Sequence, residues 1–380
     1  MTNNTPHAPT KQINYFETLF SELEDPRRTT SGHFYYPLNE ILFLTISAVL
    51  SGFESWELIQ VFGETKISWL RNFFSYKEGI PSEHVMKNVF AKLDTTAFNA
   101  CFINWVNTIS ELTQGEVVAI DGKTIRGSGT AGKKKSALHV VSAYATENRL
   151  CLGQNQVLQK ENEIVAIPKL LELLSLKGCI VTIDAMGCQK EIAKTIIEAE
   201  ADYILMVKDN QSELAAQVKK LFAQQKQCVK HETEAMGHGR IEKRICEVTD
   251  NLMFLDGKDS WVGLKSVVKI TSHRYIKATA KSSIEERYYI TSMPAEPIKI
   301  SHAVRAHWKI ENNLHWNLDV VFNEDKSRKR QDQSPANFNI IRKIALAIVE
   351  KEKTQKGSKN TKRGRAAMDD DYRKLLLTRP

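Results

Sequence analysis

The sequence predicts an α/β protein in which an all-helical N-terminal domain precedes a mixed-sheet core. Between Tyr15 and Thr113, apolar residues recur every three or four positions, which is the period of amphipathic helices. After Gly115, short β-branched apolar runs alternate with helical segments, as in proteins whose helices cover a sheet. The chain of 380 residues is long enough for two or three domains with a sizeable core.

The N-terminal domain, 15–113, is expected to contain at least three helices. Two periodic stretches span 38–52 and 56–74, and a third helix is expected to start at 81–83, where Pro and Ser suit a helix N-terminus. This domain could hold a helix-turn-helix that contacts DNA, or serve only as a helical packing domain. Residues 1–14 are polar and predict a disordered lead-in without a secretory signal.

The core is expected to follow the order β-β-β-α-β-α-β. Its fourth strand is apolar at nearly every position, as in a strand that is covered on both faces. Helices are expected at 161–175 and 191–199, where apolar residues share one face. The expected strands span 116–120, 139–145, 149–157, 178–183 and 203–207.

The C-terminal part is predicted to begin with strands and to end in helices. Residues 231–293 are rich in strand-forming segments, and helices are expected at 301–318 and 334–351. The last segment, 351–380, is basic and polar, and we expect a solvated tail or a loosely docked helix there.

Composition and charge narrow the function classes. Lys and Arg number 53 against 45 Asp and Glu, so the net charge is +8 and favours a polyanionic partner such as nucleic acid. With 42% hydrophobic and 26% charged residues, the chain is neither wholly disordered nor fibrous. The six cysteines form no C-x-x-C pair, which fits reduced thiols in a cytosol. No apolar run reaches the ~20 residues that span a bilayer, so we expect a cytoplasmic protein without a membrane partner.

Two aspartates follow buried strands directly and are candidates for chemistry. Asp121 comes after 117–120, and Asp184 comes after 180–183. Strand ends in an open α/β sheet face the crevice where ligands bind, and a carboxylate there is costly unless it is paired or binds a metal. Either residue could instead be structural, because Asp121-Gly122 is a common turn dipeptide and Asp184 could cap the next helix.

A third carboxylate, Glu311, lies one helical turn from Trp308, on or beside the face that is expected to be buried. Glu324 and Asp325 compete for this role, and Glu311 could also be a partly exposed residue that pairs with Lys309. Three acidic oxygen ligands suit Mg²⁺ or Mn²⁺. Two such ions, about 3.5–4 Å apart, can activate a nucleophile and stabilise the leaving oxygen of a phosphodiester.

Two further patterns suggest other sites. Gly127–Gly132 matches G-x-G-x-x-G, but it leads through Lys133–Lys135 into a strand, so a dinucleotide phosphate would meet no helix N-terminus. His307, Glu311 and His315 share a helical stripe and could surround zinc, but H-E-x-x-H is absent and one helical face rarely closes a metal site. Contact with phosphate or support of Glu311 is the preferred role for these histidines.

Three segments together resemble the insertion-sequence transposases of the DDE superfamily, in particular the H-repeat-associated proteins of rearrangement hot-spot elements. They are Asp121–Ser128, Asp184–Gln189 and His307–Asn312. The resemblance covers nearly the whole chain, from the helical region that begins at Pro26 onward. It also includes the segments 201–205, 238–242, 315–320 and 322–325.

The resemblance implies a ribonuclease-H-like core with an acidic triad of Asp121, Asp184 and Glu311, which would bind two Mg²⁺ or Mn²⁺ ions. The core would be interrupted before its last helix by a β-rich insertion, which matches the strand-rich stretch at 231–293. The catalytic domain would then span 114–350, followed by the basic tail.

Phosphate contacts are expected from basic residues, and the superfamily's usual ones are replaced here. The superfamily often carries Tyr and Arg before the final Glu and Lys after it, whereas Val304, His307 and Leu318 occupy these positions. His238 in the insertion is another candidate, although it could equally lie in a β-turn. The residues expected to contact DNA are Lys123, Arg126, Arg240, Arg305 and His307.

The resulting hypothesis is a metal-dependent DNA transposase that hydrolyses the phosphodiester at the element's ends and joins the freed 3′-hydroxyl to target DNA. Its partners would be the double-stranded terminal repeats and target, held by a homodimer or larger assembly in the bacterial cytosol or nucleoid. Two alternatives stay open. One is a DNA-binding protein that derives from such an element and has lost catalysis, and the other is a metal-dependent nuclease on the same core.

Overall fold

The computed structural model describes residues 14–27, 35–130, 136–158, 162–224, 228–237 and 239–378. The internal contacts of the chain divide it into two compact units. Unit 1 combines Met1–Ser110, Thr124–Leu138 and His315–Pro380, and unit 2 combines Glu111–Lys123 and His139–Leu314. The expectations for 1–13, for Lys133–Lys135 and for His238 lie outside the described residues. Within the described ranges, no helix combines the length and apolarity that crossing a bilayer requires.

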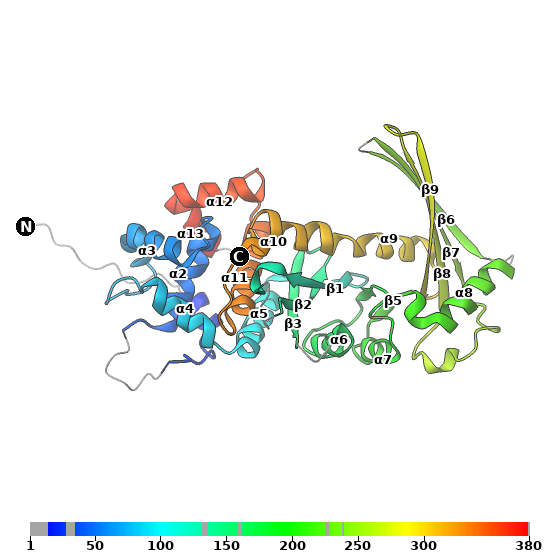
Figure 1. The fold of residues 1–380 in the computed structure, drawn as a ribbon, viewed down its shortest axis with the longest axis horizontal. Coiled ribbons are helices and arrows are strands. Elements are labelled where there is room, and N and C mark those ends of the chain that lie inside the picture. The colour runs from blue at the N-terminus through cyan, green and yellow to red at the C-terminus, as the bar shows by residue number, and fades with distance from the viewer. Residues whose placement is uncertain are drawn as a thin grey trace, which may run out of the picture. The chain divides into compact units, whose positions relative to one another are not determined.

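Unit 1 is helical, and its helices come from both the first and the last part of the sequence (Figure 1). They are α1 (Asn14–Leu19), α2 (Leu38–Leu50), α3 (Trp56–Leu70), α4 (Glu83–Lys92), α5 (Thr95–Ile109), α10 (Trp316–Val320), α11 (Ser334–Lys351), α12 (Lys359–Met368) and α13 (Asp370–Thr378). The predicted helix start at Ser82 is confirmed, because its hydroxyl accepts a hydrogen bond from the N–H of Val85. Ser55 and Asp94 cap α3 and α5 in the same way.

Helix α11 is the central helix of unit 1. It has the predicted bounds, and every residue from Ser334 to Val349 is buried. It contacts α2, α4 and α5. A helix that is buried all round belongs in the interior of a bundle, so α11 provides the surface on which the N-terminal helices pack.

Of the two alternatives expected for the end of the chain, a solvated tail or a loosely docked helix, the structure shows docked helices. The residues 359–378 form α12 and α13, both of which contact α2 and α11. Two basic residues occupy buried positions there, since Arg363 is 5% exposed and Arg373 is 0% exposed. Arg363 donates to the carbonyl oxygen of Val49 at 2.9 Å. The sequence concealed this packing because charged side chains stand where an amphipathic pattern would have apolar ones.

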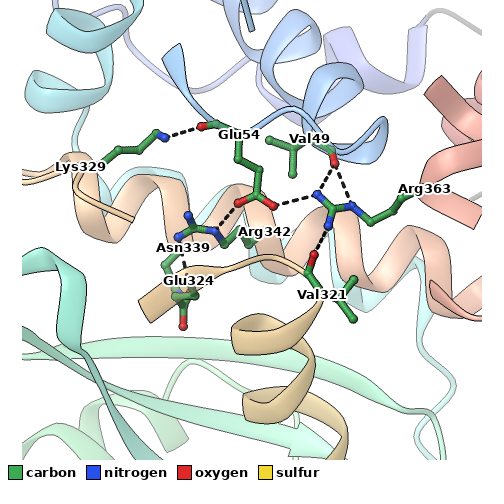
Figure 2. Close-up of polar contacts among 8 residues, drawn as sticks. All are labelled: Val49, Glu54, Val321, Glu324, Lys329, Asn339, Arg342 and Arg363. Atoms are coloured by element: carbon green, nitrogen blue, oxygen red, sulfur yellow. Dashed lines mark hydrogen bonds and ion pairs between the residues drawn. The ribbon is translucent and has the colours of Figure 1, made fainter. Parts of the chain in front are cut away.

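A buried ion network joins four segments within unit 1 (Figure 2). The carboxylate of Glu54, which precedes α3, accepts from Arg342 of α11 at 2.9 Å and from Arg363 of α12 at 2.8 Å. Arg342 also lies 3.7 Å from Glu324, whose side chain is fully buried. Lys329 donates to the backbone oxygen of Glu54. We refer to Glu54, Glu324, Lys329, Arg342 and Arg363 as the Glu54 network.

Unit 2 contains a nine-stranded mixed sheet, which confirms the predicted α/β class (Figure 1). Its strands are β1 (Val117–Ile125), β2 (Leu138–Ala145), β3 (Leu150–Val157), β4 (Ile180–Ile183), β5 (Asp202–Val207), β6 (Val229–Gly237), β7 (Arg240–Thr249), β8 (Ser266–Ile276) and β9 (Lys281–Thr291). The order across the sheet is β3-β2-β1-β4-β5-β9-β8-β7-β6. β1 pairs with β4, and β4 with β5, in parallel, whereas β2–β3 and all pairs from β5 to β6 are antiparallel.

The strand-rich stretch that was predicted at 231–293 forms β6 to β9. These strands extend the same sheet, because β9 pairs with β5 over Tyr288–Thr291. The insertion therefore shares its hydrogen-bonded ladder with the core strands.

The helices of unit 2 are α6 (Glu163–Leu171), α7 (Lys190–Glu198), α8 (Ser212–Gln224) and α9 (Pro297–His307). Figure 1 shows α6 and α7 on one side of the sheet and α9 on the other. Helix α9 contacts strands β4 to β7, and Ile300 and Ala303 on it are fully buried in the core with Val268 of β8. α8 was not predicted, although Leu214, Val218 and Leu221 mark its apolar face.

Candidate active site

Strand register places Asp121 and Asp184 at the same edge of two neighbouring strands. β1 and β4 run in parallel, and their last paired residues are Ile120 and Ile183. The next residue along the chain is an aspartate in both cases, and Asp121 lies within β1 whereas Asp184 directly follows β4. Neighbouring strands lie ~4.8 Å apart and registered residues point to the same face, so the two carboxylates start from adjacent positions.

Asp121 lies inside β1 and not at a turn. The strand continues to Ile125, so the turn suggested by Asp121-Gly122 does not form. Gly122 instead leaves room for two side chains, because a Cβ there would lie 2.1 Å from Oε1 of Glu163 and 2.7 Å from Nε2 of His139 and would make them shift. The backbone next to Asp121 is therefore packed against two ionisable side chains.

The turn after β4 fixes Asp184. Its Oδ1 accepts hydrogen bonds from the backbone N–H of Met186 at 3.1 Å and of Gly187 at 3.5 Å. The alternative role as cap of the next helix is wrong, because α7 begins at Lys190 behind Gln189. Backbone donors thus hold one carboxylate oxygen of Asp184 in place.

The two aspartates share an electrostatic field with two glutamates. The pKa of Asp121 rises to about 7, first because of burial and then because of the charges of Asp184, Glu311 and Glu163, while the N–H of Gly122 opposes the rise. The pKa of Asp184 is also raised, by burial and then by Glu163. Such mutual repulsion favours any cation that enters the site.

Glu311 lies on a π-helical turn, Ile310–His315, that follows α9. Leu314 in this turn is buried, whereas Glu311 is exposed and so lies outside the face that was expected to be buried. Lys309, the alternative ion-pair partner, instead lies 2.7 Å from Glu147. π-helical turns are rare and occur frequently at functional sites, and this one carries the predicted third carboxylate.

The two competing carboxylates have cationic or backbone partners within unit 1. Glu324 accepts from Asn339 at 2.6 Å and belongs to the Glu54 network. Asp325 accepts from the backbone N–H of Arg126 at 3.1 Å, and the guanidinium of Arg126 lies 3.6 Å away. Both residues are therefore occupied by structural contacts.

The donor chemistry of Asp121, Asp184 and Glu311, the carboxylate site, fits a hard divalent cation. Mg²⁺ and Mn²⁺ prefer carboxylate oxygens, and the three residues supply them from β1, β4 and the π-helical turn. Among the residues that the structure describes, no three Asp, Glu, His or Cys side chains form a ready metal cluster. The carboxylate site thus has suitable oxygen donors in a shared electrostatic field, but these donors do not form a closed set of ligands. For the zinc alternative at His307 and His315, the described residues likewise contain no such cluster.

The basic residues that were predicted to contact DNA lie in different settings. Arg126, Arg240 and Arg305 are exposed, and Lys123 is half-buried on β1. Arg126 is bound to Asp325 as described, and Arg240 begins β7. The contact of each of these residues with DNA stays a prediction.

His307 is held against the sheet. Its Nδ1 lies 3.0 Å from the hydroxyl oxygen of Thr182. Burial lowers the pKa of His307 to about 4, and the charge of Arg287 lowers it further against the opposing contact with Thr182. The ring is therefore neutral near pH 7 and does not replace the positive charge of the superfamily's arginine.

A basic pocket of about 230 Å³ lies between strands β7–β9 and helix α9. The guanidinium of Arg287 covers the ring of Trp308, with its carbon 4.9 Å from the ring centre. Glu242 and Glu285 pair with three of the arginines, so four arginines stand against two glutamates. The lining includes Arg244, Arg274, Arg287, Arg305, Tyr289 and Trp308. Of these arginines only Arg305 was predicted, because Arg244, Arg274 and Arg287 lie one on each of β7, β8 and β9 and come together only when these strands pair.

Two family models and several relatives match this chain. Residues 112–348 match the family model described as transposase DDE domain, and residues 18–106 match the model of its associated N-terminal domain. The chain belongs to the DDE-domain transposase family. The predicted resemblance to the H-repeat-associated branch is confirmed by the relatives that follow.

Two relatives of this transposase are provisionally named transposases. YncI of Escherichia coli O157:H7 is 40% identical over 353 residues, which are 91% of this chain and 90% of YncI. The H repeat-associated YhhI of Escherichia coli strain K12 is 40% identical over 351 residues, 90% of this chain and 92% of YhhI. A piggyBac transposase synaptic complex with hairpin DNA aligns with 97% of this chain and 78% of its own, at 12% identity and a TM-score of 0.42.

Glu163 and His139 are the residues at this site that sequence analysis missed. They lie 24 positions apart on α6 and β2, and neither belongs to a motif that spacing reveals. The only signal was the glycine after Asp121, which was interpreted as a turn residue.

Proposed function

We propose that this transposase is a metal-dependent enzyme that hydrolyses phosphodiester bonds at the ends of a DNA element and joins the freed 3′-hydroxyl to target DNA. The observation that carries the proposal is the register of Asp121 and Asp184 on parallel neighbouring strands, with Glu311 in the same field. Like charges so placed raise one another's pKa and disfavour the ionised forms, unless a cation binds between them.

The core is proposed to be ribonuclease-H-like. Strands β3-β2-β1-β4-β5 form one side of the sheet, with β2–β3 antiparallel and β1–β4–β5 parallel. The first strand would supply Asp121, the fourth Asp184, and the helix after the insertion Glu311. This chain order agrees with the triad that the family resemblance implies.

Asp121, Asp184 and Glu311 would hold two Mg²⁺ or Mn²⁺ ions. When bound, the metal would polarise the scissile phosphate and make the attacking water or hydroxyl more acidic. The protein's part is to hold the carboxylates on two strands and on the π-helical turn. Because the pKa of Asp121 is about 7 without a cation, metal binding would also release the proton that its carboxyl group holds in part of the molecules.

DNA contacts are proposed for Lys123, Arg126, Arg240 and Arg305 through backbone phosphates. The excess of arginine in the basic pocket suits a phosphate beside Arg305. His307, which is neutral, would contribute a hydrogen bond and no charge. Pairing two element ends would require at least two copies of the chain, acting on DNA in the cytosol or nucleoid.

The experiment is an excision and insertion assay on supercoiled DNA that carries the flanking terminal repeats, with Mg²⁺ or Mn²⁺. The wild-type chain should cut and join, whereas Asp121→Asn should bind the repeats and leave them uncut. Asp209→Asn, at an exposed position of unit 2, is the matched control and should behave as wild type. Full cleavage by Asp121→Asn would refute the site assignment.

The same assay separates the alternatives. Cutting without joined products would identify a nuclease on this core. Salt-sensitive DNA binding without cleavage by the wild-type chain, with either metal, would identify a protein that has lost catalysis.

A further inference from the structure

A histidine–glutamate pair lies beside the carboxylate site. Nε2 of His139, on β2, lies 2.5 Å from Oε1 of Glu163, the first residue of α6. Their side chains are 28% and 16% exposed, so the pair is largely withdrawn from solvent but still reachable. The family triad does not include either residue.

Close packing locates the pair next to Asp121. The space that a Cβ of Gly122 would take is occupied by Oε1 of Glu163 and Nε2 of His139, at 2.1 Å and 2.7 Å. A longer side chain in place of Gly122 would push both groups aside. The glycine therefore admits this pair to the strand that carries Asp121.

The charges at the site also indicate that Glu163 lies close to Asp121 and Asp184. The charge of Glu163 contributes to the raised pKa of Asp121 and is the first charge that raises the pKa of Asp184. Glu163 is thus close enough to influence both aspartates. An ion pair that served only to join β2 to α6 would not require Glu163 to lie close to the carboxylates of Asp121 and Asp184.

We propose that Glu163 is a fourth carboxylate donor for the divalent cation at this site, and that His139 holds it aside until the cation binds. The inference rests on the proposed function, because it adds a donor to the same metal site. Glu163 is already a carboxylate beside Asp121, as a hard cation requires. His139 occupies the same Oε1 atom, so it competes with the metal for that oxygen.

The test is Mn²⁺ binding to the full chain, measured by calorimetry in the absence of DNA. Glu163→Gln should weaken binding at least ~10-fold, as the loss of a ligand or its close support does. His139→Gln should bind Mn²⁺ more tightly than wild type, because it removes the group that competes with the metal for Oε1 of Glu163. Gly122→Ala should weaken binding, because its methyl group displaces the pair.

Two controls separate the possible failures. Glu147→Gln removes an exposed glutamate of unit 2 that pairs with Lys309, and should leave Mn²⁺ binding unchanged. Asp121→Asn tests the proposed function itself. If Asp121→Asn loses Mn²⁺ and Glu163→Gln does not, the inference fails alone, and if neither loses it, the metal site fails as well.

A purely structural role has its own signature in thermal unfolding. It predicts that Glu163→Gln and His139→Gln lower the melting temperature equally and leave Mn²⁺ affinity unchanged, which would overturn the inference. If Glu163→Gln does not fold, His139→Gln decides. Tighter Mn²⁺ binding by that variant supports the inference, and unchanged or weaker binding overturns it.

Discussion

The Glu54 network in unit 1 and the carboxylate site in unit 2 both gather charged side chains from distant parts of the sequence, but they treat charge in opposite ways. Glu54 meets Arg342 and Arg363 within 3 Å. At the carboxylate site, by contrast, the charges of Asp184, Glu311 and Glu163 add to the effect of burial in raising the pKa of Asp121, and Glu163 does the same for Asp184. Paired opposite charges hold a unit together, whereas carboxylates that raise one another's pKa create an affinity for a cation from outside.

The comparison predicts that removing a carboxylate has different consequences in the two regions. At the carboxylate site, function should be lost because a proposed metal ligand is missing. The fold should be kept, because one repelling charge disappears. In the Glu54 network, the fold should suffer, because two arginines lose their partner in a buried setting.

The largest effect is expected for Asp184→Asn. DNA cleavage should fall at least ~10³-fold, because residues that act as one catalytic unit fail together. The melting temperature should stay equal or rise, because burial and Glu163 already disfavour the ionised carboxylate. Cleavage assays and thermal unfolding of the same preparation check both parts. An unfolded variant would show that Asp184 stabilises the fold and would remove the contrast.

The next largest effect is expected for Glu54→Gln. It should lower the free energy of unfolding by about 3–5 kcal/mol, because the buried Arg363 loses its carboxylate partner and Arg342 is left with Glu324, at 3.7 Å. Urea denaturation measures this loss, with Glu78→Gln at an exposed position of unit 1 as the matched control. A loss no greater than that of the control would mean that water or other carboxylates compensate the arginines.

The lowered pKa of Lys329 should make the free energy of unfolding depend on pH. Burial and the charge of Arg342 lower the pKa of Lys329 to about 7, against the opposing charge of Glu54. An unfolded lysine keeps a pKa of about 10.4, so between about pH 7 and 10.4 the unfolded chain binds more protons and stability rises with pH. Below about pH 7 the full cost of the buried charge remains. Lys329→Met should flatten this rise in urea denaturation across the window, and an unchanged slope would contradict the lowered pKa.

The smallest effect is expected for Arg305→Gln in the basic pocket. If Arg305 contacts one phosphate, the slope of log affinity against log salt should fall by about 1, with a nearly uniform weakening across DNA sequences. Lys299→Gln on the same helix, whose lysine pairs with Glu296, is the control. A slope that matches the wild type would remove Arg305 from the DNA surface.

Local patterns predicted much of the fold. The helix at 334–351 was predicted with its exact bounds, because its caps and apolar positions are close together in sequence. The runs before Asp121 and Asp184 likewise predicted the strands that carry them. Both aspartates then came together because parallel pairing aligned the ends of those strands.

The missed features depend on contacts that no local pattern carries. Glu163 and His139 meet only after β2 and α6 have folded, and the glycine that admits them resembled a turn residue. In α12 and α13, buried arginines hid the apolar period. The partners of Arg363, Val49 and Glu54, lie far away in sequence, whereas Arg373 pairs with the nearby Asp370. The strand at β1 extends through Asp121-Gly122 because tertiary pairing outweighs the turn propensity of that dipeptide.

Unit 1 combines the N-terminal and the C-terminal segments of the chain, so it cannot be completed until synthesis is nearly finished. The N-terminal helices leave the ribosome well before α11, on which they pack, and all of unit 2 is made in between. Their apolar faces must therefore stay covered by transient partners or chaperones until translation is nearly finished. A polypeptide that is interrupted within unit 2 would expose those faces permanently, and proteases would remove it before it met any DNA.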